Sequence, residues 1–233
     1  YYRAMIDRYR IPLHLNTAVD LTQVREKAPD HVIVAEGARA LIPPVPGAED
    51  PDVHNAWQVL KDNTMLGKQV AVIGGGAVGL ETALFVAAKG TLTPEVLHFL
   101  MAYEAMPVER LRQLMFTGTA SVTVFEMLDR AGTDVGKSTR WILMDRLKRH
   151  GVTIRTGAKV QSISSGELTW EQDGRQHSDR FDSVILASGS RPEQRLAKAI
   201  AAAGIPHTVV GDGIQPGKLN DAIHGGFLVA LEL

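Results

Sequence analysis

The sequence predicts an α/β protein of two three-layer domains, one of them inserted into the other. Residues 69–89 have the pattern of a buried strand, a glycine turn and a helix. Two segments, residues 32–39 and 184–191, repeat a buried strand that ends in a glycine turn. A proline-rich connector, residues 42–47, cannot be helix interior or central strand and suits a linker between domains.

Composition limits the classes of protein that remain. The chain has 233 residues, of which 45% are hydrophobic and 22% charged, with a net charge of −1. This is enough for one large or two small globular domains, and the charge gives no sign of a nucleic-acid or anionic-membrane partner. The absence of cysteine excludes disulfides, thiolate zinc sites, iron–sulfur ligation and dithiol chemistry within this segment. The eight histidines lack metal-ligand spacing, so we expect no metal site.

The ends of the chain suggest a piece of a longer protein. The chain starts at Tyr1 without an initiator methionine and stops at Leu233 within an apolar run. No signal peptide is visible, and we expect a cytoplasmic protein. Residues 70–88 are long and apolar enough to suggest a membrane span. The glycines and Glu81 within them favour a buried strand, turn and helix.

The glycines follow the spacing of a dinucleotide fingerprint, Gly74-x-Gly76-x-x-Gly79, directly after the apolar run 70–73. The first glycine makes a tight turn, and the second lets the backbone approach a pyrophosphate. The third lets helix and strand pack closely, so that the helix N-terminus can face the phosphates. We therefore expect nucleotide contacts along the whole turn, from Gly74, Gly75, Gly76, Ala77, Val78 and Gly79. The alternative is a buried glycine-rich turn without a ligand.

Before the fingerprint, the pattern predicts a first helix from Tyr2 and a strand over residues 11–19, where apolar residues alternate. A buried strand follows at residues 31–36. A short helix is expected at residues 54–60.

An insertion separates the fingerprint from the next strand. Residues 91–119 carry two amphipathic helices, the first opened by Thr93 and Pro94. Their expected role is packing on the surface of the nucleotide domain, with a lid or a subunit contact as alternatives.

The strand at residues 121–125 ends at Glu126. An acidic residue about 20 residues after the glycines usually takes the ribose hydroxyls. Here Glu126 comes 47 residues after Gly79, and the inserted helices account for the excess. A carboxylate there repels a 2′-phosphate, which predicts NADH in preference to NADPH. Arg130 could serve a 2′-phosphate if the loop curled back.

The second half alternates helix, short strands and a buried strand. A helix from Ser138 is expected to turn Trp141, Met144 and Leu147 inward, and short antiparallel strands follow over residues 152–181. Val-Ile-Leu-Ala-Ser-Gly-Ser-Arg (184–191) then echoes Val-Ile-Val-Ala-Glu-Gly-Ala-Arg (32–39). The echo suggests two related dinucleotide domains, with chance similarity of two buried strands as the alternative.

The last elements are a strand at residues 207–210 and a helix that opens near residue 220. Asp212, at the carboxyl end of the strand, is placed to bond a ligand hydroxyl. The helix N-terminus beside it suits a phosphate or a reduced flavin. The alternative, that Asp212 is only a turn residue without a ligand, is equally expected.

Four phrases together resemble a known family: Val-Ile-Gly-Gly-Gly-Ala-Val-Gly-Leu-Glu (72–81), Ala-Ser-Gly-Ser-Arg-Pro (187–192), Val-Gly-Asp (210–212) and Leu-Asn-Asp-Ala-Ile-His-Gly-Gly-Phe (219–227). They resemble the flavoproteins with two dinucleotide-binding domains that are related to glutathione reductase. The closer likeness is to the C-terminal half of 2,4-dienoyl-CoA reductase, trimethylamine dehydrogenase and clostridial 2-enoate reductase. The insertion looks most like the last of these.

The resemblance implies two Rossmann-like domains, with an NAD(H)-binding domain inserted into an incomplete FAD-binding domain. Residues 1–63 are expected to form the first part of the incomplete FAD domain, and residues 64–188 the NAD(H) domain. With residues 189–233 the chain is expected to return to the FAD domain. It also implies an N-terminal barrel of the same protein, with FMN and an iron–sulfur cluster, that reduces a small-molecule substrate. A homo-oligomer is left open.

The resemblance further assigns cofactor contacts and nominates no catalytic residue, because hydride relay between cofactors works by positioning. NADH would be held by the glycines, Glu126 and Met127, with Gly189 along its path. FAD would touch Gly37, Gly211, Asp212 and His224. Two features depart from the family: the first FAD fingerprint is absent, and Glu36 replaces the usual threonine near the flavin edge. A non-catalytic module that holds ADP or NAD is the alternative function.

Overall fold

The computed structural model describes all 233 residues, in two compact units. One unit combines Tyr1–Arg39 with Arg191–Leu233, and the other is Ala40–Ser190. The sequence places the first boundary at residues 63 and 64. The structure divides earlier because strand β3 (Val53–Asn55) pairs with β10 (Ser183–Leu186) in the sheet of the second unit.

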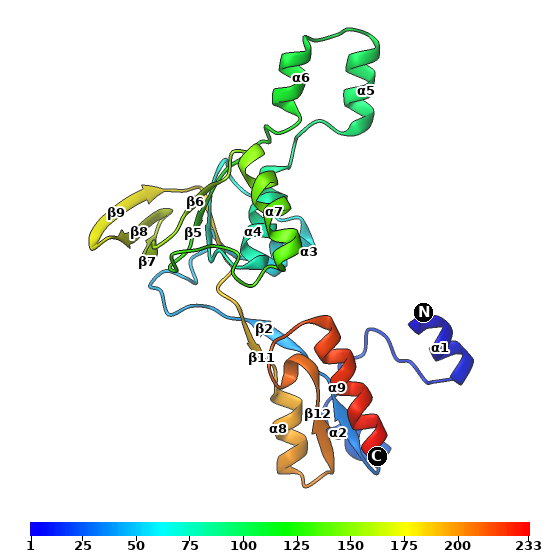
Figure 1. Cartoon of the computed structure of the whole chain (residues 1–233). Coiled ribbons are helices and arrows are strands. Elements are labelled where there is room, and N and C mark those ends of the chain that lie inside the picture. The colour runs from blue at the N-terminus through cyan, green and yellow to red at the C-terminus, as the bar shows by residue number, and fades with distance from the viewer. The chain divides into compact units, whose positions relative to one another are not determined.

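The second unit, Ala40–Ser190, is built on a five-stranded parallel sheet in the order β3–β10–β4–β5–β6. Three helices cover one face, and an antiparallel three-stranded sheet lies on the other (Figure 1). The strands are β4 (Gln69–Ile73), β5 (Ser121–Phe125), β6 (Thr153–Arg155), β7 (Lys159–Ser164), β8 (Glu167–Gln172) and β9 (Arg175–Arg180), and the helices are α3 (Ala56–Asp62), α4 (Ala77–Ala87) and α7 (Lys137–Arg149). This three-layer arrangement confirms the predicted α/β fold class.

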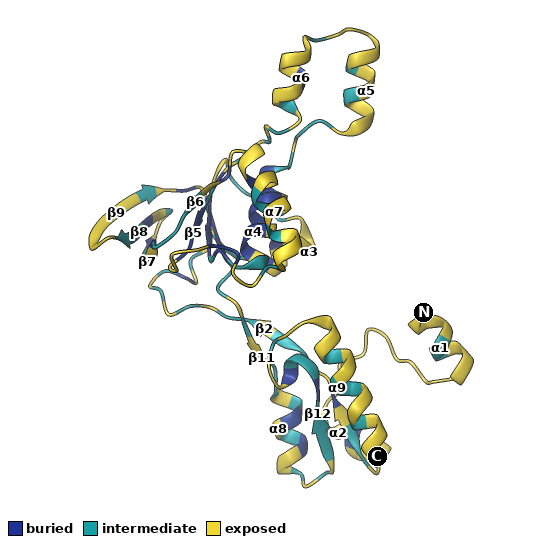
Figure 2. Ribbon diagram, in the orientation of Figure 1, coloured by how far each residue is buried: buried dark blue, intermediate teal, exposed yellow.

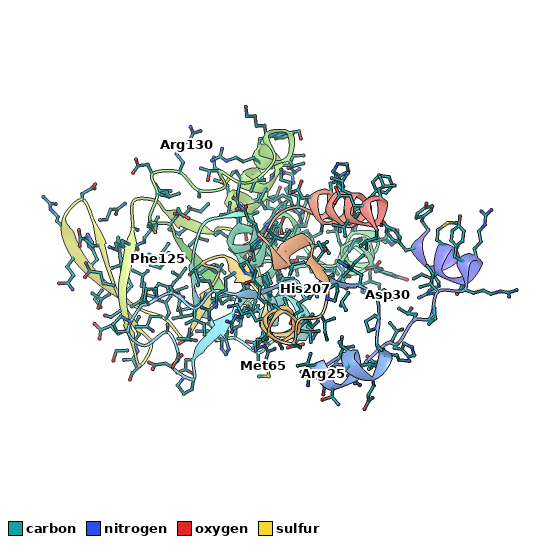
Figure 3. All side chains as sticks on the ribbon, turned by 90° about the horizontal axis from the view of Figure 1, so that it is seen from below. Arg25, Asp30, Met65, Phe125, Arg130 and His207 are labelled. Atoms are coloured by element: carbon teal, nitrogen blue, oxygen red, sulfur yellow. The ribbon has the colours of Figure 1, made fainter.

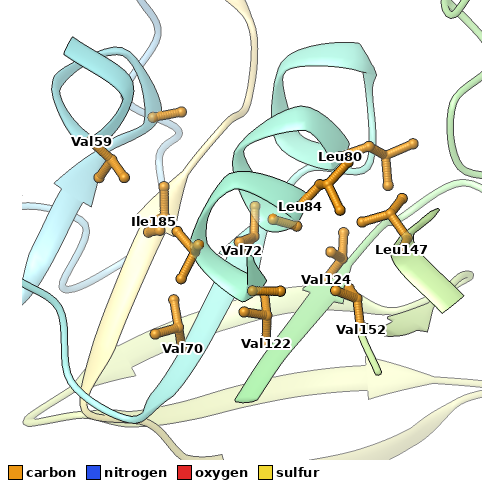
Figure 4. Packing of buried hydrophobic residues seen from close by; sticks show 14 of the residues in the cluster. Val59, Val70, Val72, Leu80, Leu84, Val122, Val124, Leu147, Val152 and Ile185 are labelled. Atoms are coloured by element: carbon orange, nitrogen blue, oxygen red, sulfur yellow. The ribbon is translucent and has the colours of Figure 1, made fainter. Parts of the chain in front are cut away.

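Strand β4 is apolar throughout because both faces of the sheet are covered. Val70 and Val72 point toward the helices and pack against Leu80, Leu84 and their neighbours (Figure 4). Ala71 and Ile73 point the other way, into a cluster with Phe125 and Trp170. The strand therefore holds the glycine turn at its end in a fixed position.

The insertion forms a helical hairpin, α5 (Pro94–Ala102) and α6 (Val108–Leu114). The Thr93 hydroxyl caps α5 by accepting from the Val96 N–H, and at the base the Thr119 N–H donates to the Lys89 carbonyl at 2.8 Å. The hairpin extends from the unit and is largely exposed (Figure 2). Only Leu111 of the two helices is buried. The expected packing on the domain surface is therefore not seen.

The first unit is smaller. Strands β1 (Val32–Val34) and β12 (His207–Val209) pair in parallel, and helices α2 (Leu21–Lys27) and α8 (Arg195–Ala202) pack with them around Val24, Val34 and Ile200. Strands β2 (Ala38–Ala40) and β11 (Ser190–Pro192) pair where the chain passes between the units. Helix α1 (Tyr2–Tyr9) and helix α9 (Leu219–Glu232), which follows the 3₁₀ turn η1 (Gly211–Gly213), complete the unit.

Three expectations for local structure are wrong. Residues 11–19 form no strand, because Pro12 lacks an N–H and no strand of the chain runs beside them. Trp141 is 68% exposed, not turned inward, while Leu147 of the same helix is buried. Strand β6 joins the parallel sheet beside β5 and does not belong to the antiparallel one.

The proline connector is also more than a linker. The Ile163 N–H donates to the Pro46 carbonyl at 2.8 Å, and Val45 packs against the core below the antiparallel sheet. The connector thus belongs to the second unit. None of the helices has the length and apolar character that crossing a membrane requires.

Candidate functional site

A cleft of about 760 Å³ opens at the carboxyl ends of β4, β5 and β10, in the second unit. In open parallel sheets, ligands bind at this end of the strands. Its walls are the glycine turn, the proline connector, the end of β5 and the segment after β10: Pro43, Pro44, Val45, Ile73, Gly74, Gly76, Ala77, Val78, Phe125, Glu126, Met127, Leu128, Asp134, Ala158, Lys159, Val160, Gln161, Ala187, Ser188 and Gly189.

The glycine turn has the geometry that its spacing predicts. Gly74 has a φ of 110°, which favours glycine, and its N–H donates to the Phe125 carbonyl at 2.8 Å. A β-carbon at Gly79 would overlap the Gly74 carbonyl oxygen. Helix α4 can therefore start directly beside the strand, with Gly76 at its N-cap. Because Gly76 has no side chain, the N-cap residue itself supplies no acceptor for the first N–H groups of α4.

Glu126 lies beside this turn although 47 residues separate it from Gly79. The side chain is buried, and Oε2 accepts from the Gly75 N–H at 2.7 Å. Its other oxygen, Oε1, accepts from the Leu128 N–H at 2.8 Å. The parallel pairing of β4 with β5 produces this contact because it places Phe125 next to Ile73. The carboxylate is thus fixed at the edge of the cleft.

Met127 and Gly189, the other expected contacts in this unit, also line the cleft. Met127 is mostly exposed, and Gly189 has a φ of 95° with open space where a β-carbon would be. Seven of the nine expected residues in this unit line the cleft. The other two are Gly75, whose N–H is bonded to Glu126, and Gly79, which lies against the Gly74 carbonyl.

Sequence reasoning missed several residues of the cleft. Ser188 lines it, and its Oγ is a buried side-chain oxygen without a hydrogen-bond partner. Lys159 is the one cationic residue among the lining residues. Their signal in the sequence was their place at strand ends: Ser188 follows β10, and Lys159 begins β7.

Asp134 is a further residue that the sequence did not single out. Its carboxylate accepts from the Ala77 N–H, with both oxygens at 3.0 Å from the nitrogen. In the sequence, an aspartate three residues before α7 suggests the start of that helix. The loop after β5 instead carries it to the start of α4.

Arg130 lies in the same loop and is exposed (Figure 3). It is not among the residues that line the cleft.

The four expected flavin contacts lie in the first unit. The Gly37 carbonyl accepts from the Glu193 N–H at 3.0 Å, and Asp212 Oδ1 accepts from the Gly217 N–H at 3.1 Å. Gly211 packs close to Ala222 of α9, so the turn and the helix are neighbours. His224 is exposed on α9.

Glu36 has a structural role that the sequence did not predict. Its two oxygens accept from the Leu196 and Ala197 N–H groups, each at 3.0 Å. The carboxylate therefore caps helix α8 and satisfies two N–H groups that the helix leaves free. It does not stand as a free charge.

No group of three or more potential metal ligands occurs in the structure.

Comparison with known proteins gives consistent results. The profile of the pyridine nucleotide-disulphide oxidoreductase family matches residues 6–213. A metal reductase of Desulforamulus reducens is 38% identical over 91% of this chain and 32% of its own length. An NADH oxidase of Thermoanaerobacter brockii is 30% identical over 100% of this chain and 32% of its own length. The chain thus spans about a third of the length of these relatives.

Among solved structures, 2-naphthoyl-CoA reductase in complex with 2-naphthoyl-CoA has the same fold. The TM-score is 0.81 at 24% identity, covering 100% of this chain and 31% of that chain. These findings confirm the resemblance stated from the sequence. The chain belongs to the pyridine nucleotide-disulphide oxidoreductase family, a family of flavin- and pyridine-nucleotide-dependent oxidoreductases.

Proposed function

We propose that the cleft of the second unit binds NADH. The pyrophosphate would lie at the start of α4, and the adenosine ribose diol would bond to Glu126. The observation that carries this proposal is the position of Glu126, whose buried carboxylate is fixed beside the glycine turn at 2.7 Å from the Gly75 nitrogen. A carboxylate in this position accepts hydrogen bonds from ribose hydroxyls.

The residues present fit such a ligand. The absence of side chains at Gly74 and Gly76 leaves the backbone open to a phosphate group, and a cleft of about 760 Å³ is within the usual range for small-molecule sites. Met127 and Gly189 also line this cleft. NADH, when bound, supplies a hydride. The residues of this chain bind and orient it, and we assign no acid, base or nucleophile.

We propose NADH in preference to NADPH. The carboxylate of Glu126 repels a 2′-phosphate, and both of its oxygens already accept backbone N–H groups, which holds it in place. The NADH oxidase of T. brockii is a relative whose name agrees with this choice. Arg130 is exposed and could counter the preference only if its loop moved.

For the whole protein, we propose that this chain is the C-terminal part of a longer reductase. FAD would receive the hydride, with contacts at Gly37, Gly211, Asp212 and His224. A barrel earlier in the same protein, with FMN and an iron–sulfur cluster, would reduce an activated C=C bond of a 2-enoate or dienoyl-CoA. The greater length of the relatives and the fold shared with 2-naphthoyl-CoA reductase support this proposal.

One observation favours a second candidate, a module that holds ADP or NAD without catalysis. Glu36 stands where the family has threonine, and its carboxylate is used as a helix cap near Gly37. The side chain at this position is thus engaged by α8 and is not available to a flavin.

The experiment is a binding titration of the purified chain with NADH and with NADPH, before and after Glu126→Ala. We expect NADH to bind more tightly than NADPH, and the substitution to weaken NADH and reduce the discrimination. A strong preference of the unmodified chain for NADPH would overturn the proposal. In the full-length protein, bleaching of bound FAD by NADH supports the reductase, whereas a colourless protein that retains ADP supports the second candidate.

A further inference from the structure

We propose that Asp134 is a built-in competitor for the nucleotide phosphate, which sets the affinity of the cleft for dinucleotides. The proposal rests on the proposed function of the cleft. The Asp134 carboxylate holds the first N–H of α4, and a pyrophosphate that approaches this helix must displace it or bind against its charge.

The contact itself is direct. Both oxygens of Asp134 lie 3.0 Å from the Ala77 nitrogen, and Ala77 is the first residue of α4. Gly76, at the N-cap, has no side chain to satisfy this group. An anion at this position is stabilised by the partial positive charge of the helix N-terminus. The side chain of Asp134 thus takes the place in which a phosphate oxygen would be stabilised for the same reason.

The contact is supported by the loop that carries Asp134. The Gly132 N–H donates to the Gly75 carbonyl at 2.7 Å, which ties the loop to the glycine turn. The Arg140 guanidinium donates to the Ala131 carbonyl at 2.7 Å and the Gly132 carbonyl at 3.1 Å. The carboxylate is therefore delivered to α4 by a fixed backbone. Asp134 itself is exposed, so it can be released into water when a ligand arrives.

The N–H groups of the turn that remain for a ligand surround the one that Asp134 holds. Glu126 accepts from the Gly75 N–H, and Asp134 accepts from the Ala77 N–H. The N–H groups of Gly76, Val78 and Gly79 have no acceptor in the chain. A phosphate bound by these groups would lie next to the Asp134 carboxylate.

The charges of the residues that line the cleft also oppose the binding of a phosphate. Glu126 and Asp134 are its two acidic residues, and Lys159 is its one cation. A pyrophosphate brings two negative charges to a surface that already carries net negative charge. Repulsion from Asp134 must therefore lower the affinity, most strongly at low ionic strength.

The test compares Asp134→Asn with a matched control, Asp129→Asn. Both remove one carboxylate from the same exposed loop, but Asp129 does not line the cleft. Asparagine keeps an oxygen that can accept from Ala77, so the loop is retained. Calorimetric titrations with NADH, ADP and adenosine, at low and high salt, would measure the dissociation constants for the unmodified chain and both variants.

We expect Asp134→Asn to bind NADH and ADP about two- to fivefold more tightly at low salt, the effect of one charge at a helix N-terminus. The gain should shrink at high salt, and adenosine, which has no phosphate, should show none. Asp129→Asn should match the unmodified chain. If Asp134→Asn binds NADH equally or more weakly, or improves adenosine as much as ADP, the inference is wrong and the proposed function stands. If no variant binds NADH or ADP, the proposed function fails, and this inference fails with it.

Discussion

The Glu126 Oε2 atom accepts a hydrogen bond from the Gly75 N–H at 2.7 Å and so joins the end of β5 to the glycine turn after β4. A second bond from the Leu128 N–H, at 2.8 Å, uses the other oxygen. A residue proposed to contact the ligand therefore also holds together the backbone on which the ligand would lie.

This double role predicts a loss of stability for Glu126→Ala. The substitution leaves two N–H groups without an acceptor, and each buried unsatisfied group costs about 1–3 kcal/mol. We expect a lower midpoint in urea unfolding. Glu81→Ala, which removes an exposed carboxylate from α4, should stay within about 0.5 kcal/mol of the parent. Equal midpoints for the two variants would show that the bonds of Glu126 do not contribute.

The close contact between α4 and β4 predicts that Gly79→Ala is not tolerated. The added β-carbon would overlap the Gly74 carbonyl oxygen and force the helix away from the sheet. Overpacking of this kind costs about 1–3 kcal/mol or more. Gly225→Ala is the matched control in α9, because its β-carbon meets nothing within 4 Å. Thermal unfolding should show a loss for the first variant and no loss, or a small gain, for the second.

Trp170 and Trp141 should respond in opposite ways to the same substitution. Trp170 is 2% exposed, and its Nε1–H donates to Asp179 at 2.9 Å, so Trp170→Ala should cost about 3–5 kcal/mol. Trp141, on α7, is exposed, so Trp141→Ala should change stability by less than about 0.5 kcal/mol. Denaturant unfolding of both variants measures the difference. A large loss for Trp141→Ala would mean that its face of α7 is covered in solution.

The carboxylate of Glu193 should make a pH-dependent contribution to the stability of the fold. Desolvation alone would raise its pKa, but the Arg195 N–H, the Arg195 and Arg39 guanidinium groups and the Gln194 N–H outweigh it, so that the pKa lies below its ordinary value. A lowered folded-state pKa stabilises the fold above the unfolded-state pKa, and this contribution is lost as the pH falls through the folded-state value.

Glu193→Gln should therefore lower the urea midpoint at neutral pH, and the difference from the parent should disappear in acid. The effect should be small, because the Arg39 and Arg195 side chains that pair with the carboxylate are exposed to water. A difference that persists unchanged at acid pH would contradict the assignment to charge.

The sequence predicted the elements with a strong apolar pattern. Strand β4 and helix α4 were identified because a covered parallel strand is apolar on both faces, and because Gly74, Gly76 and Gly79 occur at a spacing that has a steric reason. Glu126 was identified across the insertion, because the acidic residue follows a strand whatever the length of chain before it.

Other expectations failed where the partner of a segment decides its structure. Residues 11–19 alternate like a strand, but alternation needs a neighbouring strand, and none lies beside them. Trp141 falls on an apolar spacing in α7, yet the sheet accepts Leu147 from that helix and leaves the tryptophan exposed. Glu36 was expected near the flavin edge, and its capping role was missed because the helix that it caps begins 159 residues later, at Arg195.

The sequence by itself determined the α/β class, the glycine turn and the family to which the chain belongs, since these depend on local periodicity and on glycine spacing. Only the tertiary structure decided how the acidic side chains are used. Glu126 binds the turn, Asp134 holds the first N–H of α4, and Glu36 caps α8. The physical reason is that a free helix N–H can donate to any carboxylate that the fold brings near it, and no sequence distance encodes that approach.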